Sequence, residues 1–381
     1  MSPAAGQTIA DARAQALVAS YERAGYRRAE PAILQPAEPF LDLSGEDIRR
    51  RMYLTSEASG RELCLRPDLT IPVARDYLAS SSAGEPAGFC YLGPVFRQRE
   101  NQPGEFLQAG IESFGRRDTA VVDAEMLARG LEALAQYGID APEIRIGDVG
   151  LFTHLLDALE LPPAWRRRLA KDFHRAGGVA HDLDQWRLDA ARSVPEYQGL
   201  LAALAGSDLR AAHALVTDLL SIAGITTVGG RSVGEIADRF LEQAALGAAA
   251  RLPQQTRTII EQFLKIAGDP DDAVAELRAL AEKTGLALKP AIDLIENRTG
   301  FLAAHGIDVS RIRFATAFGR GVDYYTGFVF ELHDHAARVS GPLVGGGRYD
   351  ALLSRLGAKE PIPAVGFAVW IDRLQAIGGT A

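Results

Sequence analysis

Strand-like segments lie in both end regions of this sequence, and a long helical stretch separates them. Before residue 150, AGFCYLGPVFRQ and FLQAGIESFG flank the turn-forming loop ENQPGE, and EIRIGDV follows them. From Leu151 to about Gly300, Ala- and Leu-rich segments recur at helical period and are broken by Gly and Pro. Strand signals return in RIRFATAFG, FVFELHD and VSGPLVGGGRYD. Because the strands do not alternate with single helices, the sequence predicts an α+β fold whose sheet is completed by both end regions.

This pattern divides the chain into three predicted parts. Residues 1–150 form the first part of a core, 151–300 a helical insertion, and 301–381 the second part of the same core. A chain of 381 residues, 47% hydrophobic, can bury about three quarters of its unfolded surface. We expect the insertion to serve packing or partner contact, because its spacing shows no functional motif.

Three stretches are predicted to be helices around the sheet. Apolar residues recur at helical spacing from Thr8 to Ala24, and Gly25 is placed to end that helix. A second helix runs from about Asp118 to Gly138. The closing stretch PAVGFAVWIDRLQAIGGTA predicts a third helix with Arg373 at the edge of an apolar stripe. This stripe consists of Phe367, Trp370, Ile371, Leu374 and Ile377.

Composition argues against several classes of protein. No stretch reaches the roughly 18 apolar residues that a membrane span requires, and the N-terminus lacks a basic start followed by an apolar run, so we expect a cytoplasmic protein without membrane contact. The net charge of −8 argues against a nucleic acid as main partner. Cys64 and Cys90 lack the companions of a zinc site or disulfide framework, so buried thiols are expected. We expect no metal and no cofactor.

Four segments place charged or hydroxyl groups in an apolar, strand-like context, where an unpaired charge is costly. They are LRPDLT (65–70), FRQRENQPGEFLQAGIE (96–112), FGRGVDYYTGFVFE (318–331) and GGGRYD (345–350). Together they predict a polar site built on a sheet. GGGRYD lacks the spacing of a phosphate-binding Walker loop, and the scattered histidines do not suggest a catalytic triad. His333 and His335 are assigned to a solvated loop.

The side chains of these segments match the groups of an amino acid. Arg97 and Arg320 offer planar forks for a carboxylate or a phosphate. Asp68 and Glu112 could pair with an ammonium group. Four further residues supply neutral donors and acceptors: Thr70, Gln108, Tyr324 and Tyr325. They could orient a small zwitterion that carries a ring with two nitrogens.

In this order, the segments resemble the histidyl-tRNA synthetase family of class II aminoacyl-tRNA synthetases. LCLRPDLT is similar to the family's LRPEGT, and the 96–112 segment to its arginine-bearing hairpin ending in QxGxE. RGVDYYTGFVFE resembles RGLDYYxxTVFE, which is peculiar to histidine enzymes; GGGRYDALL resembles GGRYDGL, and AVGFAVWIDRL resembles AVGFAxGxERL. The resemblance spans about Pro31 to Glu143 and Arg311 to Leu374. It implies an antiparallel sheet flanked by helices.

The resemblance also implies a role for each site residue. Asp68, which stands where the family has Glu, would face the α-ammonium of histidine with Thr70 and Gln108. Arg97 and Arg320 would face its carboxylate. The residues expected around the imidazole nitrogens are Glu112 and Tyr325, with Tyr324 beside them.

Departures from the family lie on what would be its ATP and tRNA sides. Arg99 stands where the hairpin of the family has Glu, so a charge is inverted unless Glu100 compensates by a one-residue slip. The loop that follows is shorter than in the family and lacks its basic residues. Trp370 replaces a glycine, so we expect its indole to fill space near Arg373, the arginine that a synthetase would offer to ATP. Arg373 is expected to stack on that ring or to pair with an acidic neighbour. Because only QAIGGTA follows the closing helix in this sequence, we expect the protein to lack the anticodon-binding domain of the synthetases.

The sequence keeps the histidine site of the family but departs from it at the ATP and tRNA elements. In this combination it resembles the synthetase-like regulatory subunits of ATP phosphoribosyltransferase. The resemblance implies a non-catalytic subunit that binds free histidine as a feedback signal and docks on a short catalytic subunit. It also implies a homodimer within a larger hetero-oligomer, with no tRNA partner. Two alternatives remain open: a truncated enzyme that activates histidine with ATP, and a scaffold whose site is vestigial.

Overall fold

The computed structural model describes residues 12–44, 48–173, 177–189 and 252–378, together with 214, 217–219, 222, 227–228 and 231–232. It divides into two compact units. The first contains Met1–Leu155, His174–Ala176 and Gln262–Ala381, and the second Leu156–Phe173 and Gly177–Glu261. The segment predicted as an insertion, 151–300, therefore contributes to both units, and much of it lies outside the described residues.

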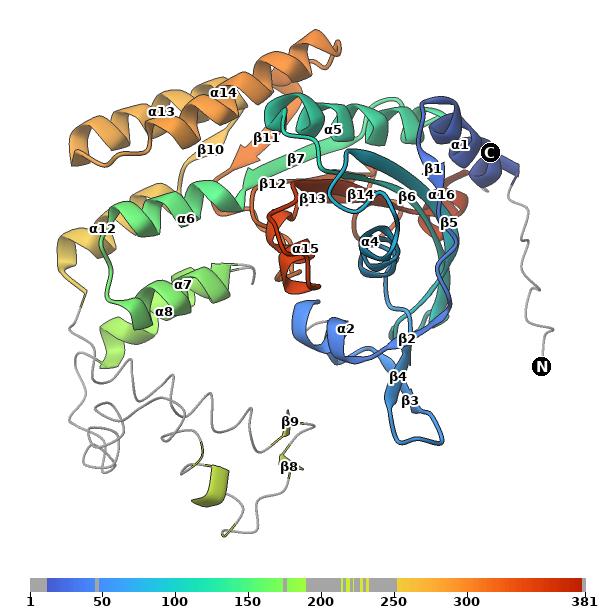
Figure 1. Ribbon diagram of the computed structural model, residues 1–381. Helices are drawn as coiled ribbons and strands as arrows, with labels where there is room; N and C mark the ends of the chain where they lie inside the picture. Colours follow the sequence, from blue (N-terminus) through green and yellow to red (C-terminus); the bar gives the residue numbers. More distant parts are fainter. Residues whose placement is uncertain are drawn as a thin grey trace. The chain divides into compact units, whose positions relative to one another are not determined.

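A nine-stranded sheet forms the centre of the first unit (Figure 1), in the order β1-β5-β6-β14-β13-β12-β7-β11-β10. β1 runs parallel to β5 and β11 parallel to β7, whereas the other neighbours are antiparallel. The strands are β1 (Arg27–Arg28), β5 (Ala87–Phe96), β6 (Glu105–Phe114), β7 (Glu143–Asp148), β10 (Ala267–Gly268), β11 (Ile312–Ala315), β12 (Phe328–His333), β13 (Val344–Arg348) and β14 (Ala364–Trp370). Because strands from both end regions join one mostly antiparallel sheet, the α+β prediction is confirmed.

Alternation along the strands gives this sheet two different faces. In β14, Val365, Phe367 and Val369 point to one face, which we call the core face. The ring of Phe367 meets Tyr21 of α1 (Ala12–Arg23) there, at 6.2 Å between centroids. The opposite face, which we call the site face, carries Trp370. Strand register places Gln108 and Glu112 of β6 on the site face as well.

Helices pack on the core face of the sheet (Figure 1). On the core face, α5 (Thr119–Ala135) contacts β12, β13 and β14, and α14 (Lys289–Ala304) packs on α5. α13 (Pro270–Thr284) packs on α14 and is capped by Asp269, whose side chain accepts hydrogen bonds from the backbone of Asp271 and Asp272. The other helices of the first unit are α2 (Glu38–Leu43), α4 (Thr70–Ala79), α6 (Val149–Ala158, whose last turn enters the second unit), η1 (Val309–Arg311), α15 (Asp350–Arg355) and α16 (Ile371–Gly378).

A smaller antiparallel sheet, in the order β2-β4-β3, also belongs to the first unit. Its strands are β2 (Leu34–Pro36), β3 (Tyr53–Ser56) and β4 (Glu62–Leu65). In the second unit, Arg168 joins two helices through an ion pair with Asp182 at 2.8 Å. The elements of that unit are α7 (Pro163–Phe173), α8 (Gly178–Asp189), β8 (Thr227–Val228), β9 (Arg231–Ser232) and most of α12 (Gln254–Leu264).

The prediction of a helix from Pro363 onwards is wrong in its first half. Residues Ala364–Trp370 form strand β14, and the helix begins only at Ile371. Phe367 and Trp370 therefore face opposite sides of the sheet instead of sharing a helical stripe. The register decides this, because β14 pairs along its whole length with β6 on one side and along most of it with β13 on the other.

The other local predictions within the described residues agree with the structure. The hairpin is formed by β5 and β6, and a helix follows Asp118 as expected. Of the N-terminal helix predicted over Thr8 to Ala24, residues 8–11 lie outside the described part, and the rest is helical to Arg23. Cys64 and Cys90 are buried free thiols, as predicted. None of the helices within the described ranges is long and apolar enough to cross a membrane.

Candidate functional site

The predicted site residues come from four places around the site face. Asp68 and Thr70 lie at the start of α4, and Arg97 directly follows β5. Gln108 and Glu112 lie on β6, where they point to the same side. Arg320, Tyr324 and Tyr325 lie in the connection from β11 to β12. Contacts between these segments show that the fold brings them together.

Glu112 is fully buried, and its hydrogen-bond partners are hydroxyl groups. Its Oε1 accepts hydrogen bonds from Thr70 Oγ1 at 2.8 Å and from Tyr91 Oη at 3.2 Å. Its Oε2 accepts one from Tyr349 Oη. Burial raises the pKa of Glu112 to about 8, although the three hydroxyl groups oppose that shift. The carboxyl group is therefore held in a polar cage whose three members carry no positive charge to neutralise it.

Glycines on neighbouring strands make room for this arrangement. Gly366 lies opposite Glu112 in the β14–β6 register, and a Cβ atom there would lie 1.7 Å from Glu112 Oε2. Gly110 lies opposite Tyr91, and a Cβ atom there would lie 2.4 Å from the tyrosine hydroxyl. Any larger residue at either position would displace the side chains that form the cage.

Two further predicted residues hold buried acceptor atoms. Asp68 Oδ1 accepts a hydrogen bond from the backbone of Ile71 at 3.2 Å, but Asp68 Oδ2 has no donor within the described residues. Gln108 Oε1 is likewise buried and has no donor there. Burial raises the pKa of Asp68, and the nearby Arg97 opposes that shift. Because unpaired buried acceptors are rare and costly, these two oxygens are available for donors of a ligand.

Arg320 is held on the site face by side chains on two sides. Its Nε donates to Glu331 Oε1 at 3.0 Å, and its Nη1 donates to Tyr325 Oη at 2.7 Å. The Tyr325 ring stands next to Tyr324, at 5.0 Å between centroids. Tyr324 in turn meets the Tyr349 ring at 5.6 Å, which links the Arg320 segment to the Glu112 cage.

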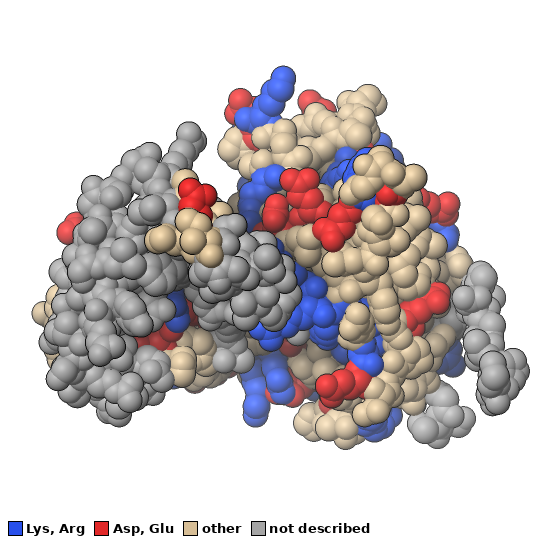
Figure 2. Space-filling view, turned by 90° about the horizontal axis from the view of Figure 1, so that it is seen from below, with Lys and Arg blue, Asp and Glu red and all other residues tan. Residues whose placement is uncertain are grey.

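The residues of the expected ATP side also lie close together. Arg373 lies over the Trp370 ring at 5.0 Å, which agrees with the expected stacking, and it donates to the backbone oxygen of Pro342. Arg99 pairs with Asp372 at 3.0 Å. Burial lowers the pKa of Arg373, and repulsion from Arg99 and Arg97 adds to this shift. Figure 2 shows Lys and Arg side chains gathered near the middle of the surface seen from below Figure 1.

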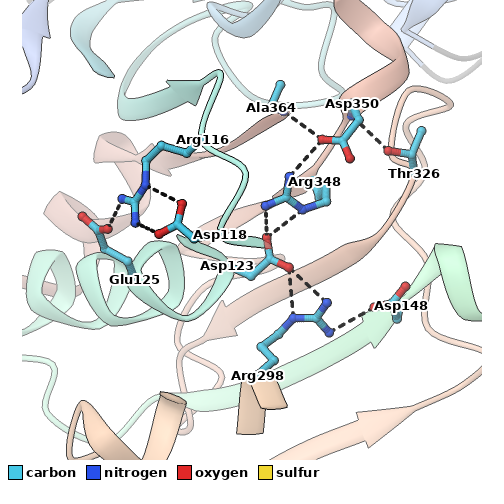
Figure 3. A network of polar contacts seen from close by, with 10 residues as sticks. All are labelled: Arg116, Asp118, Asp123, Glu125, Asp148, Arg298, Thr326, Arg348, Asp350 and Ala364. Carbon is cyan, nitrogen blue, oxygen red and sulfur yellow. Dashed lines mark hydrogen bonds and ion pairs between the residues drawn. The ribbon is translucent and has the colours of Figure 1, made fainter. Parts of the chain in front are cut away.

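Arg348, from the GGGRYD segment, points away from this site. It lies on the core face, where its Nε and Nη2 donate to Asp123 Oδ1 at 2.9 and 2.6 Å (Figure 3). Arg298 of α14 binds the other oxygen of Asp123 at 3.0 Å and also binds Asp148 at 3.0 Å. This network ties α5, α14, β7 and β13 together. The same motif thus supplies Tyr349 to the site and Arg348 to the core.

Sequence reasoning missed three residues of the site: Tyr91, Tyr349 and Glu331. All three lie within segments that had been singled out as strand or polar segments, but the composition of a segment does not tell to which face each side chain points. The hairpin register could have identified Tyr91, because this residue lies opposite the small Gly110, on the same face of the sheet as Glu112. His333 is also corrected: it ends strand β12 and bonds Glu331, whereas a solvated loop had been expected.

Comparison with known proteins places these residues in a family. A histidyl-tRNA synthetase family model matches residues 1–223 and 213–374. A protein of Brucella canis named ATP phosphoribosyltransferase regulatory subunit is 43% identical over 356 residues, covering 92% of this chain and 93% of that protein. Its counterpart in Brucella ovis is 43% identical with the same coverage. The chain belongs to this family of synthetase-like regulatory subunits.

Solved structures agree with this membership. A histidine–tRNA ligase subunit of Alicyclobacillus acidocaldarius has a TM-score of 0.59 and 27% identity, covering 98% of this chain and 95% of that one. A Bacillus halodurans protein, described as an ATP phosphoribosyltransferase regulatory subunit/histidyl-tRNA synthetase, has a TM-score of 0.66 at 23% identity, covering 96% of this chain and 78% of that one. The second likeness concerns the fold alone. The predicted class II synthetase-like fold is confirmed.

Proposed function

We propose that the protein is a non-catalytic regulatory subunit of an ATP phosphoribosyltransferase in the cytoplasm. It binds free histidine on the site face, and this binding is the feedback signal at the first step of histidine biosynthesis. Its partner is a short catalytic subunit that requires it for activity. The relatives named as regulatory subunits, 43% identical over nearly the whole chain, support the role. The geometry of the site supports histidine as the ligand.

The main support for histidine as the ligand comes from two buried acceptor atoms that lack a hydrogen-bond donor. Asp68 Oδ2 and Gln108 Oε1 have no donor in the described ranges, and both belong to the site that also holds Glu112 and Arg320. An ammonium group offers three donors and a positive charge, which satisfies both oxygens and offsets the burial of Asp68. A ligand with a primary amine therefore fits this part of the site better than a neutral metabolite does.

The remaining groups fit the rest of a histidine molecule. Arg97 and Arg320 would hold the carboxylate, and Thr70 would assist Asp68 and Gln108 at the ammonium group. The imidazole would meet Glu112 and Tyr325, with Tyr324 beside them. With its pKa raised to about 8, Glu112 titrates near neutral pH, the range in which an imidazole also gains or loses a proton. A protonated imidazole would supply the cation that the Glu112 cage lacks.

Feedback requires that histidine bind with different affinity to the active and inhibited states of the complex, because equal affinity would shift nothing. A coupling of about 1 to 3 kcal/mol is typical of such systems. We expect the protein to act as a homodimer within a hetero-oligomer, without tRNA as a partner. The surface that meets the catalytic subunit would transmit the change.

Calorimetry with histidine and co-purification with a short catalytic subunit test this proposal together. We expect the purified protein to bind histidine, and histidine to lower the activity of the complex. Asp68→Asn should weaken binding, because it removes the charge that meets the ammonium group. Absence of histidine binding, or feedback that is unchanged in Glu112→Ala, would refute the sensor role.

The alternative, a histidine-activating enzyme, needs cations free to meet the phosphates of ATP. Here Arg99 is paired with Asp372, and Arg373 is stacked on Trp370, so the geometry favours the sensor. Histidine-dependent exchange of pyrophosphate into ATP would decide in favour of the enzyme. If Trp370 fills the ATP space, Trp370→Gly should gain ATP binding, and an unchanged variant would contradict that view.

A further inference from the structure

Arg320 is anchored by a carboxylate that has a second partner. Glu331 Oε1 accepts from Arg320 Nε at 3.0 Å, and its Oε2 lies 2.9 Å from His333 Nε2. The three side chains are little exposed, at 10%, 17% and 16% for Arg320, Glu331 and His333. They form a chain from the end of β12 to the site. Neither Glu331 nor His333 is among the residues assigned to the ligand.

The sheet register explains why Arg320 can lie against Glu331. Gly345 of β13 lies directly opposite Glu331 of β12, on the site face. A Cβ atom at Gly345 would lie 2.4 Å from Arg320 Nη2 and 2.6 Å from its Cζ. The guanidinium group therefore occupies the space that the missing side chain leaves.

A competing cation near Glu331 is held elsewhere. Arg145 of β7 lies opposite Glu331 in the register on its other side. However, Arg145 binds Glu143 through Nε at 3.0 Å and Nη2 at 2.9 Å. Among the described residues, the hydrogen-bond partners of the Glu331 carboxylate are therefore Arg320 and His333. Attraction and hydrogen bonds from these two groups outweigh burial and lower the pKa of Glu331 to about 2, so the anchor is charged at every physiological pH.

The anchors leave one edge of the guanidinium group for a ligand. Nε donates to Glu331 and Nη1 to Tyr325, whereas no acceptor for Nη2 or for the second Nη1 proton lies among the described residues. The rings of Tyr325 and Trp370 lie 5.5 and 5.8 Å from Arg320 Cζ. A bidentate carboxylate contact uses two such N–H groups in a fixed plane. An arginine already fixed in this plane loses less rotamer freedom when a ligand binds.

We propose that Glu331 and His333 are positioning residues that hold Arg320 in the orientation that receives the carboxylate of the ligand. The inference rests on the proposed histidine site. Glu331 fixes the guanidinium plane directly, and His333 fixes the rotamer of Glu331. The effect is specific to the carboxylate, so it concerns selection of the free amino acid over analogues that lack this group.

The test is a comparison of histidine with histidinol, in which a hydroxymethyl group replaces the carboxylate. The preference of the protein for histidine over histidinol, measured by calorimetry, reports the carboxylate contact alone. Glu331→Asp keeps the charge but withdraws the anchor by one methylene, and we expect this preference to fall about tenfold. His333→Leu should lower it about threefold, and His333→Gln, which keeps an N–H donor, should restore it.

Glu132→Asp is the matched control, because it makes the same change at another arginine-paired glutamate, which lies on α5 and binds Arg129 instead of Arg320. It should leave the preference unchanged. An unchanged preference in Glu331→Asp, or equal losses for both ligands in Glu331→Asp and His333→Leu, would overturn the positioning role. Wild-type protein that binds neither ligand would instead overturn the proposed function, and the inference with it.

Discussion

Two buried carboxyl groups on opposite faces of one sheet have contrasting surroundings. On the core face, Asp123 is bound by Arg298 and Arg348, both less than 5% exposed (Figure 3). On the site face, Glu112 is bound by three hydroxyl groups and no cation is among its hydrogen-bond partners within the described ranges. Arginines of the protein neutralise the first carboxylate, whereas the second carboxyl group has no such partner, and burial raises its pKa to about 8.

This difference separates a structural ion network from a ligand site. A buried ion pair with both partners present stabilises a particular arrangement of elements, and removing one partner is strongly destabilising. A buried carboxyl group among hydroxyls is costly when ionised and is therefore poised for a cationic ligand. Burial alone does not distinguish the two sites, but the identity of the partners does.

The largest expected effect concerns the core face. Asp123→Ala leaves two buried arginines without their shared partner, so we expect the free energy of unfolding to fall by about 3 to 5 kcal/mol. Urea denaturation measures it. Arg116→Gln, which breaks a more exposed pair with Asp118, should cost no more than about 1 kcal/mol. Equal losses in the two variants would show that the network on the core face is not structural.

On the site face, the corresponding change should affect binding and leave folding intact. Glu112→Gln removes the charge but keeps the shape, and we expect histidine affinity to fall about 30- to 100-fold, because a hydrogen bond to a charged group is lost. Calorimetry gives the affinity, and thermal unfolding checks the fold. Glu125→Gln, on α5, serves as the control that should bind normally. Normal histidine affinity in Glu112→Gln would contradict the assigned role.

The pH dependence of stability should also differ between the wild-type protein and Glu112→Gln. The pKa of Glu112 is about 8 in the folded chain and near its usual 4.5 when unfolded. Between these values the folded state binds a proton that the unfolded state lacks, so stability from this group falls as pH rises, by up to about 1.4 kcal/mol per pH unit. Denaturation without ligand between pH 5 and 8 should show this decline, smaller in Glu112→Gln. Identical pH profiles would argue against a raised pKa.

The smallest expected effect is that of replacing one tyrosine by phenylalanine, and we compare this substitution on the two faces of the sheet. Tyr349→Phe removes a hydroxyl that donates to Glu112, so the free energy of unfolding should fall by about 1 kcal/mol at pH 8. Tyr21→Phe removes a buried hydroxyl that has no partner among the described residues, and it should be neutral or slightly stabilising. Chemical denaturation of both variants measures the contrast. A larger loss for Tyr21→Phe would reverse our interpretation of the two hydroxyls.

The motifs predicted most of the candidate site, but not how its residues contact one another. Asp68, Thr70, Gln108, Glu112 and Arg320 were identified because polar groups stood out in apolar segments, and the fold brings these segments together. The hydroxyl cage of Glu112 could not be predicted, because Tyr91 and Tyr349 reach it from β5 and from the end of β13. Contacts between strands depend on register, which the sequence of one strand does not contain.

The closing segment shows the same limit for the fold. Phe367, Trp370, Ile371 and Leu374 fit a helical stripe, and a short apolar run of this kind does not by itself distinguish a helix from a buried strand. Pairing with β6 and β13 made its first half a strand and turned Trp370 to the site face. Because a helix had been expected at that residue, its position opposite Gln108 was not foreseen.

The sequence by itself determined the α+β class, the family and the residue types of the site, because these depend on local pattern and on motifs. Only the tertiary structure decided which face each side chain takes. Tyr349 and Arg348 are neighbours in the chain, yet one binds Glu112 and the other binds Asp123 on the opposite face. The physical reason is the two-residue period of a strand, which sends adjacent side chains to opposite sides, where the other elements of the fold supply their partners.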